Sequence, residues 1–293
     1  MRVSVIVPTY RRCAELGEAL RSLAVQTYKD TEIIVIDDNA DVKWNSDVER
    51  NVQDIQNEFI GINLKCIVNS QNFGSAKSRN IGIEASSGEY ITFLDDDDIY
   101  LPKKIERQVA FMRNGGYDYS ITDLYLYNKN EKLVNKRVRN YITEVSADAL
   151  QKYHLMYHMT GTDTMMFTRE FLLKIGGFDE IDLGDEFYLI QKAIEANGNF
   201  GYLKGCDVKA YIHTGEGGLS SGDGKINGEN VLHEYKKRHF DKLDLKTRKY
   251  IKMRHYAVIA FAEIRRGNML AFFLNAVKSF FCAPVFFVKM VLG

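Results

Sequence analysis

Residues 91–98 read ITFLDDDD, an apolar run that passes directly into four consecutive aspartates. β-Branched and aromatic residues in such a run favour a buried strand. Adjacent carboxylates are unfavourable there, because two like charges about 5 Å apart repel by about 3 kcal/mol at an effective dielectric of about 20. The sequence therefore indicates that Asp95–Asp98 lie at a strand end, where some partner offsets their charge.

The first hundred residues alternate strand-like and helix-like segments. The strand-like runs are short, apolar and polar at their ends: 3–10, 32–39, 64–70 and 89–96. The helix-like segments between them are 14–27, 47–59 and 75–85. This alternation predicts an α/β fold with a mostly parallel sheet flanked by helices on both faces. In such Rossmann-like sheets, ligands bind beyond the carboxyl ends of the strands.

Beyond residue 100 the pattern is mixed. The expected helices are 101–112, 169–175 and 185–196, and the expected strands are 117–127, 162–168 and 208–214. The segment 215–228 holds six glycines and two serines, a composition that favours a mobile loop.

Charge is unevenly distributed along the 293 residues, although the formal net charge is zero. From Lys236 to the C-terminus, thirteen Lys and Arg face three acidic residues, a net charge of +10, which leaves −10 on residues 1–235. The four cysteines are widely scattered, and the chain starts directly with a strand pattern rather than a secretory signal. We therefore expect a reduced, cytoplasmic protein with one large domain and a basic appendage.

Three roles compete for Asp95–Asp98. One or two of these carboxylates can cap the following helix. A calcium loop would use Asp95, Asp97 and Glu106, but Tyr100 stands where that loop needs glycine. The third role is to hold Mg²⁺ or Mn²⁺ with one or two carboxylates, while a substrate diphosphate completes the coordination shell.

Six features in order carry a resemblance to a known family: VSVIVPTYRR, VIDDN, NFGSAKSRNIGIEASSGEYITFLDDDD, GGFDE, GDEFYLIQKA and the later His213. Over residues 1–220 the chain resembles the family 2 glycosyltransferases, which have a nucleotide-sugar-binding fold of GT-A type. The resemblance implies a catalytic domain at 1–220, with a nucleotide-binding half at about 1–100 and an acceptor half at about 101–220. Residues 221–293 would form a C-terminal helical appendage.

The resemblance also implies the reaction. It indicates an inverting, divalent-metal-dependent transfer of one sugar from a nucleotide-sugar donor, here expected to be UDP-linked. The expected acceptor is a lipid-linked or cell-surface polysaccharide. Trp44 is the only tryptophan, so the QxxRW motif of processive synthases is absent and single addition is favoured.

Donor-side roles follow from the same resemblance. Tyr10 would stack on a pyrimidine, and Asp38 would read the edge of the base, with Asp37 capping or positioning its loop. The residues implied in nucleotide binding are Pro8, Thr9, Tyr10, Arg12, Asp38, Arg79, Asp95 and Asp96. Asp95 and Asp97 have the DxD spacing, and the implied ligands of Mn²⁺ or Mg²⁺ are Asp97, Asp95 and His213. The structural alternatives are a half-buried strand-end ring for Tyr10, a surface ion pair for Arg79 and a packing role for His213.

The family carries its catalytic base on an acidic pair at the start of a helix after GGFD. By register Glu186 takes this position, and Asp185 is the alternative. Either would remove a proton from the acceptor hydroxyl, although acidic residues at a helix start can also simply cap it. The residues implied on the acceptor side are Gly177, Phe178 and Asp179, and Phe178 is equally compatible with a core position.

The C-terminal segment is basic and aromatic. From Ile264 to Gly293 there is no acidic residue, and six of the seventeen phenylalanines occur there. Apolar residues follow helical spacing, while Lys278 and Pro284 argue against a membrane-spanning helix. We expect an interfacial helix on an anionic membrane, which places the protein peripherally on the cytoplasmic face. Packing against the catalytic domain or a homodimer contact is the alternative, and the phenylalanines argue against nucleic acid.

Two other functions compete with glycosyl transfer. A sugar-phosphate nucleotidyltransferase should carry a glycine-rich loop after the first strand, and VPTYRR has none. A non-catalytic, membrane-attached module would hold a nucleotide sugar without turnover. The carboxylates of Asp97 and Glu186 argue against that module.

Overall fold

The computed structural model of the chain describes residues 1–181, 184–212 and 222–292, which form two compact units. The described part of the first unit comprises residues 1–147, 159–181 and 185–212. That of the second comprises 148–158, Gly184 and 222–292.

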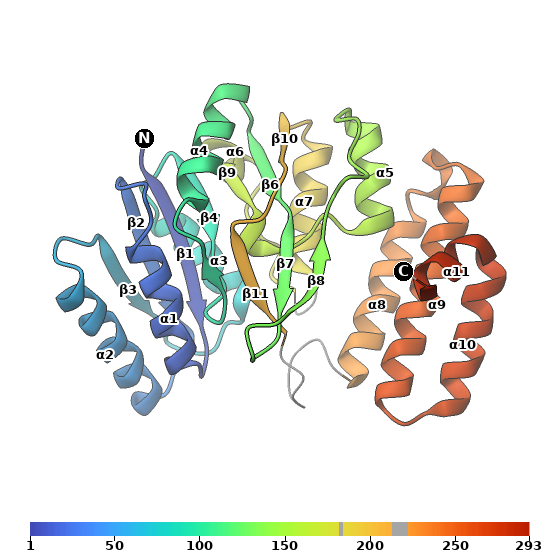
Figure 1. Cartoon of the computed structure of the whole chain (residues 1–293), viewed down its shortest axis with the longest axis horizontal. Helices are drawn as coiled ribbons and strands as arrows, with labels where there is room; N and C mark the ends of the chain where they lie inside the picture. The colour runs from blue at the N-terminus through green and yellow to red at the C-terminus, as the bar shows by residue number, and fades with distance from the viewer. Residues whose placement is uncertain (182–183, 213–221, 293) are drawn as a thin grey trace. The chain divides into compact units, whose positions relative to one another are not determined.

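A seven-stranded sheet with the order β10-β6-β9-β4-β1-β2-β3 forms the centre of the first unit (Figure 1). Its strands are β1 (Val3–Thr9), β2 (Thr31–Asp37), β3 (Leu64–Val68), β4 (Tyr90–Phe93), β6 (Tyr119–Thr122), β9 (Met166–Thr168) and β10 (Phe200–Leu203). Neighbouring strands are parallel except β9, which runs antiparallel to β4 and β6. The predicted α/β class with a mostly parallel sheet is confirmed.

Helices pack on both faces of this sheet, because alternate side chains of a strand point to opposite faces. Val3, Val5 and Val7 of β1 belong to a buried cluster with α1 (Cys13–Ala24) and α2 (Val42–Glu58). Ile6 instead meets α3 (Ser75–Ala85), where a Cβ on Gly82 would lie 2.4 Å from its Cγ2 atom. Every residue of β1 is buried, which explains its nearly continuous apolar sequence.

The strand register brings the predicted site segments to one edge of the sheet. β1 is paired in parallel with both β2 and β4, with Thr9 opposite Asp37 and Ile6 opposite Phe93. The chain leaving β1, β2 and β4 therefore emerges at neighbouring positions. This is the edge at which ligands of parallel α/β sheets bind.

A second sheet contains the strands β5 (Ile99–Tyr100), β11 (Val208–Tyr211), β7 (Leu124–Tyr127) and β8 (Leu133–Arg137). The single strand predicted over 117–127 is wrong, because the chain divides at Asp123 into β6 and β7 of different sheets. The buried Asp123 carboxylate accepts hydrogen bonds from the backbone N–H groups of Gly205 (2.9 Å) and Arg139 (3.0 Å). These contacts fix the chain where it changes sheets.

The other helices of the first unit are α4 (Lys104–Gly115), α6 (Arg169–Lys174) and α7 (Asp185–Glu195), all close to their predicted ranges. α4 ends at Gly116, which adopts the left-handed conformation common after helices. The strand predicted over 162–168 is shorter, because Thr162–Thr164 form the 3₁₀ turn η1 before β9.

The second unit is helical. Its elements are α5 (Ala147–Tyr157), α8 (Gly222–Lys237), the turn η2 (Phe240–Lys242), α9 (Leu245–Arg265), α10 (Met269–Cys282) and α11 (Pro284–Leu292). The loop predicted over 215–228 is wrong for 222–228, which begin α8, and its remainder lies outside the described residues. α10 packs on α9, with the Ser279 hydroxyl donating to the Met253 carbonyl at 2.8 Å. Across the described ranges, no helix combines the length and apolar character needed to cross a membrane.

Candidate active site

The aspartate turn, Asp95–Asp98, follows β4 and contacts the end of β1. The Asp96 Oδ2 atom accepts hydrogen bonds from the Thr9 hydroxyl (2.7 Å) and the Tyr10 backbone N–H (3.3 Å). Asp96 is buried, and this burial raises the pKa of its carboxyl to about 6. The structure thus brings together Thr9, Tyr10 and Asp96, three of the residues assigned to nucleotide binding.

Arg12 neutralises two of the four carboxylates. Its Nη1 atom lies 3.0 Å from Asp96 Oδ1 and 2.5 Å from Asp97 Oδ2. The Asp97 side chain is only 10% exposed, while that of Arg12 is 42% exposed. In this structure the partly exposed Arg12 guanidinium therefore offsets the charge of the acidic turn.

Arg79 neutralises a third carboxylate and links it to α7. Its Nη2 atom lies 2.6 Å from Asp95 Oδ1, and its Nη1 atom lies 2.9 Å from Asp185 Oδ2. Burial lowers the pKa of the Arg79 guanidinium, but the charges of Asp95 and Asp185 outweigh this effect and the pKa is raised. Arg79 is buried rather than part of a surface ion pair.

Glu186 lies in the first turn of α7. Its Oε2 atom accepts a 2.7 Å hydrogen bond from the backbone N–H of Gly161. Burial and the neighbouring charge of Asp185 raise the pKa of its carboxyl to about 7. A carboxylate with a pKa near neutrality is well matched to general-base catalysis at physiological pH.

Asp38 is buried and surrounded by donors. It accepts hydrogen bonds from the backbone N–H groups of Phe73 and Gly74, both at 2.8 Å, and from Asn69 Nδ2 at 2.7 Å. These contacts hold the turn that leads into α3. Its role in reading a base edge stays a prediction, as does stacking by Tyr10, whose side chain is 42% exposed and accessible.

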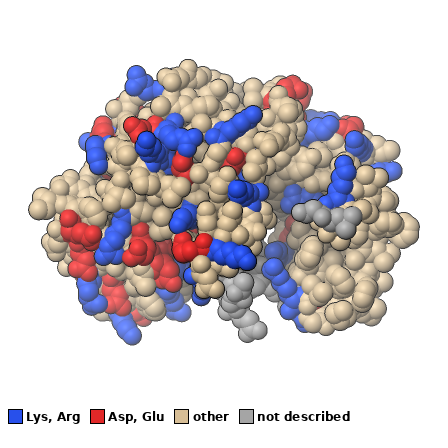
Figure 2. Space-filling view, in the orientation of Figure 1, with Lys and Arg blue, Asp and Glu red and all other residues tan. Residues whose placement is uncertain are grey.

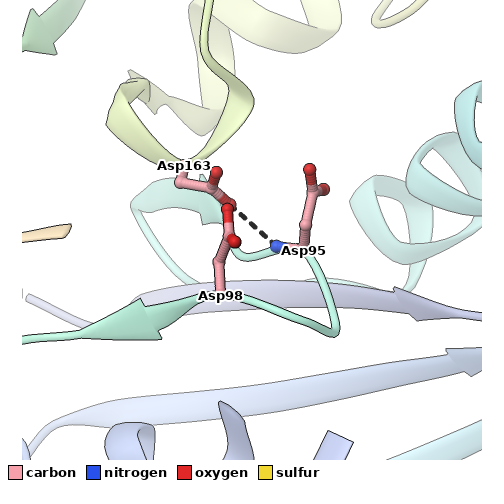
Figure 3. Close-up of side chains that lie close together, drawn as sticks. All are labelled: Asp95, Asp98 and Asp163. Carbon is pink, nitrogen blue, oxygen red and sulfur yellow. Dashed lines mark hydrogen bonds between the residues drawn. The ribbon is translucent and has the colours of Figure 1, made fainter. Parts of the chain in front are cut away.

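Asp163 joins the aspartate turn from a distant part of the sequence. Figure 3 shows its carboxyl beside Asp98, with the Asp95 N–H donating to Asp163 Oδ1 at 2.7 Å. Burial and the charge of the neighbouring Asp163 raise the pKa of the Asp98 carboxyl. Burial raises the pKa of Asp163 to about 7. One oxygen from each of the three aspartates lies within 4.8 Å of the others.

Asp98 does not cap the following helix. α4 begins at Lys104, its N-cap residue Lys103 makes no side-chain cap, and the first-turn N–H of Ile105 donates to Gln26 Oε1 at 3.2 Å. The Asp98 Oδ1 atom instead accepts a 2.9 Å hydrogen bond from the backbone N–H of Tyr211. The fourth carboxylate therefore ties the turn to β11. His213, assigned as a metal ligand, lies outside the described residues.

The residues assigned to the acceptor side have different surroundings. Phe178 is 2% exposed. Its ring lies edge to face with that of Phe93, and the two ring centroids are 5.0 Å apart. Gly177 has φ +61°, and a Cβ there would lie 2.6 Å from Asn80 Oδ1. Asp179 is ion-paired with Lys192 at 2.6 Å. Phe178 is thus a core residue, and the acceptor role of this segment stays a prediction.

Pro8 is buried within β1, opposite Ile36 of β2. It therefore contributes to the packing immediately before the site.

A sequence model of glycosyl transferase family 2 matches residues 4–175. This chain belongs to glycosyl transferase family 2. The resemblance carried by the six sequence features is confirmed.

Two curated relatives of this family 2 chain have named activities. It is 32% identical over 187 residues to the GalNAc(5)-diNAcBac-PP-undecaprenol beta-1,3-glucosyltransferase of Campylobacter jejuni, covering 63% of this chain and 57% of the relative. It is 31% identical over 152 residues to the UDP-Glc:alpha-D-GlcNAc-diphosphoundecaprenol beta-1,3-glucosyltransferase WfaP of Escherichia coli, covering 52% and 56%. The chain thus spans little more than half the length of either relative.

Solved structures share the GT-A fold. S. aureus TarS 1–349 in complex with UDP-GlcNAc has a TM-score of 0.59 at 19% identity, covering 96% of this chain and 91% of TarS 1–349. The mannosyltransferase PcManGT of Pyrobaculum calidifontis, in complex with GDP-Man and Mn²⁺, has a TM-score of 0.56 at 17% identity, covering 99% and 75%. The predicted GT-A fold is confirmed.

The sequence interpretation of this family 2 chain missed Asp163, Tyr100 and Lys104. The Tyr100 hydroxyl lies 2.5 Å from the Phe93 carbonyl oxygen and 3.0 Å from that of Asp163. Lys104 Nζ is buried and lies 2.6 Å from the same hydroxyl. The one available signal was the acidic residue inside the apolar run TDTMMFT, because an aspartate in a buried strand needs a polar partner.

Proposed function

We propose that this family 2 chain transfers one sugar, with inversion, from a UDP-linked donor to a lipid-linked or cell-surface polysaccharide acceptor. The observation that carries the proposal is the Arg79 bridge between Asp95 and Asp185. This bridge joins the acidic end of β4 to the acidic start of α7, so that donor-side and base carboxylates belong to one site. A sugar-transfer reaction needs both groups within reach of one anomeric carbon.

The choice of donor and acceptor is supported by relatives. WfaP is named for UDP-Glc, and TarS 1–349 was solved with UDP-GlcNAc. Both named glucosyltransferases act on undecaprenol-linked diphosphates. In this chain Tyr10 offers an exposed ring at the end of β1 for the uracil, and Asp96 lies beside it for the ribose.

The turn provides ligands of the type that Mn²⁺ or Mg²⁺ prefers. Both cations take oxygen ligands, commonly one or two carboxylates with substrate phosphates. Asp95 and Asp97 lie two residues apart in the turn, and the Asp95 side chain is 35% exposed. The donor set fits, and PcManGT was solved with Mn²⁺. When bound, the cation would neutralise the donor diphosphate.

Glu186 acts as the base in this proposal. Its carboxylate takes the proton from the acceptor hydroxyl as the hydroxyl oxygen bonds to the anomeric carbon and the bond to UDP breaks. The Gly161 N–H orients the carboxylate through Oε2. Burial raises the pKa of the neighbouring Asp185, an effect that the Arg79 guanidinium opposes, and burial with the Asp185 charge raises the pKa of Glu186 to about 7.

The second unit would attach the enzyme peripherally to an anionic membrane on the cytoplasmic face. Figure 2 shows an almost entirely tan surface over α10. The exposed apolar residues, which we call the apolar face, are Leu270, Phe273, Leu274, Val277 and Phe281 of α10 and Val285, Val288 and Val291 of α11. Exposed Lys278 and Lys289 lie in the same helices, and no acidic residue follows Glu263. This combination suits an interfacial helix pair, with self-association as the alternative outcome.

Thermal stabilisation by a panel of nucleotides tests the proposed donor. A ligand at 100 times its dissociation constant stabilises the folded state by about 2.7 kcal/mol. We expect UDP and UDP-sugars to raise the melting temperature only with Mn²⁺ or Mg²⁺, and GDP, CDP and dTDP to have smaller effects. Equal stabilisation by every nucleotide, or none by UDP, would refute the proposed donor.

A further inference from the structure

The segment Gly161–Met165 lies between the aspartate turn and the start of α7. At one end, the Gly161 N–H holds Glu186 Oε2 at 2.7 Å. Two residues later, Asp163 Oδ1 accepts the Asp95 N–H at 2.7 Å. One short segment therefore contacts both the proposed base and the proposed donor-side carboxylates.

Two buried side chains donate hydrogen bonds to carbonyl groups of this segment. The Tyr100 hydroxyl lies close to a third carbonyl, although its nearer acceptor is the Phe93 carbonyl oxygen at 2.5 Å. The Tyr100 hydroxyl lies 3.0 Å from the Asp163 carbonyl oxygen. Gln108 Nε2 donates to the Thr164 carbonyl at 3.0 Å, and the Thr92 hydroxyl donates to the Met165 carbonyl at 2.6 Å. Buried hydrogen bonds of this kind hold a segment in place, because breaking one leaves an unpaired polar group away from water.

Lys104 supports the segment indirectly, through the hydroxyl groups of Tyr100 and Thr92. Its buried Nζ atom lies 2.6 Å from both the Tyr100 and the Thr92 hydroxyl oxygens. Burial lowers the pKa of Lys104 well below its usual value, and its Nζ–H groups donate to the oxygen of each hydroxyl. Each hydroxyl hydrogen is then directed elsewhere, and the backbone carbonyls are the partners within reach.

The Asp163 carboxyl connects this segment to the aspartate turn. Besides accepting the Asp95 N–H, it lies beside the Asp98 carboxyl, which accepts the Tyr211 N–H at 2.9 Å. Figure 3 shows Asp163 reaching both ends of the turn. Asp95 continues the chain of contacts to Arg79 and Asp185.

We propose that Asp163 is a positioning residue for sugar transfer, whose carboxyl sets the aspartate turn at a fixed position relative to Glu186. The inference rests on the transfer reaction proposed above. Asp163 has no direct contact with substrate in this role. It acts through the hydrogen bond from the Asp95 N–H, which an amide oxygen can also accept, and through its place beside the Asp98 carboxyl.

The distinguishing pair of variants is Asp163→Asn and Asp163→Ala. Asparagine keeps an oxygen for the Asp95 N–H and supplies an N–H donor to the Asp98 carboxylate, so we expect nearly wild-type turnover. Alanine removes both contacts. A displacement of about 1 Å can cost about 100-fold in rate, so we expect a loss of that order in kcat with the acceptor KM unchanged.

Glu32→Ala is the matched control for general destabilisation. Glu32 is also a buried carboxylate, but it accepts bonds from the Ser4 hydroxyl (2.5 Å) and the Gly88 N–H (3.0 Å) at the opposite edge of the sheet. We expect the melting temperature of Glu32→Ala to be lower than that of the wild type, while its kcat stays at the wild-type level. All variants are assayed well below their melting temperatures.

Amide hydrogen exchange gives a readout that does not depend on the donor. We expect faster exchange in peptides covering 94–100 and 159–165 for Asp163→Ala, but not for Asp163→Asn or Glu32→Ala. Calorimetry with Mn²⁺ and UDP on the same proteins separates the two hypotheses, because a wild-type protein that fails to bind refutes the proposed donor and leaves the exchange result valid. The positioning role is overturned if folded Asp163→Ala keeps wild-type exchange and kcat, or if Asp163→Asn is as impaired as alanine.

Discussion

The backbone N–H of Gly161 donates a 2.7 Å hydrogen bond to Glu186 Oε2, in a half-buried position beside Asp185. The hydrogen bond favours the ionised carboxylate, whereas burial and the Asp185 charge favour the protonated form. The second pair of effects is larger, and the pKa is raised to about 7. Glu186 thus changes protonation state within the physiological pH range.

The pH profile of turnover is the first prediction. A base must be ionised to accept a proton, so kcat should rise with pH through about 7 and reach a plateau above it. Turnover measured from pH 5.5 to 9 at saturating donor, metal and acceptor checks this. A flat profile over that interval would remove Glu186 from the role of base.

Replacing Glu186 with glutamine should abolish transfer while donor binding is retained. General-base catalysis contributes about 10²–10⁴-fold, and we expect a loss in kcat of at least about 100-fold. Glu195→Gln, at the exposed end of the same helix, is the charge-matched control. If Glu186→Gln keeps its turnover and Asp185→Asn loses it, Asp185 is the base.

The same glutamine variant should be more stable than wild type at alkaline pH. Glu186 has a pKa of about 7 in the folded protein against an ordinary value of 4.5, so the folded state binds this proton more tightly. The stability from this proton is fully present below about pH 4.5 and is lost as pH rises through 7. Melting temperatures should therefore favour Glu186→Gln at pH 8 and converge toward pH 5. A lower melting temperature for the variant at pH 8 would contradict this.

Local sequence patterns were sufficient for β1, β2, β3 and β4 of the central sheet and for the strand ends that carry the site, but they did not indicate β10. The runs at 3–10, 32–39 and 89–96 are mostly apolar in the middle and polar toward their ends, as expected of strands that are buried on both faces and end at a site. β8 gave no comparable signal, because its five residues, LVNKR, are all exposed and do not form an apolar run. Its place in the sheet depends on pairing with β7, which the sequence does not reveal.

Contacts between distant residues account for the missed part of the site. Asp163 lies 68 residues from Asp95 in the chain, yet their backbone and side-chain atoms are 2.7 Å apart. Composition was misleading at 222–228, where three glycines lie inside α8 because tertiary context overrides helix propensity. The domain boundary at residue 220 stays a prediction, because it falls outside the described residues.

Asp97 should be required for metal-dependent nucleotide binding. Its carboxylate, 10% exposed and held by Arg12 at 2.5 Å, is the proposed direct metal contact. Asp97→Asn should lose calorimetric binding of UDP in Mn²⁺, while Asp54→Asn, which removes an exposed charge on α2, should not. Unchanged UDP affinity in Asp97→Asn would show that the metal, or its ligand, lies elsewhere.

Arg79 should be essential for both stability and turnover. Removing one partner of a buried ion pair costs about 3 kcal/mol, because the other charge is left unpaired. Arg79→Ala leaves the buried Asp185 in that state, while Asp95, with its side chain 35% exposed, is partly solvated. Lysine carries the charge but lacks the two-nitrogen geometry that bridges Asp95 and Asp185, so Arg79→Lys should also lose turnover. Denaturant unfolding and kcat measure the two effects.

Arg50→Ala is the control for the Arg79 variants. Its pair with Asp47 is on the surface, with the Arg50 side chain 69% exposed, and such pairs contribute about 0–1 kcal/mol. An Arg79→Ala protein no less stable than Arg50→Ala would refute the bridging role.

The apolar face of α10 and α11 should carry membrane binding. Burying one phenylalanine is worth about 1.5–3 kcal/mol, so replacing the exposed Phe273 and Phe281 with serine should weaken partitioning onto anionic vesicles by at least about tenfold. Val231→Ser, at an exposed position of α8, is the control and should bind as wild type. Charge reversal of Lys278 and Lys289 should weaken binding mainly at low salt, because screening suppresses the attraction otherwise. If the double serine variant sediments with vesicles as the wild type does, the apolar face is not the membrane-binding surface. If the variant also loses a dimer that the wild type forms in solution, the face serves self-association.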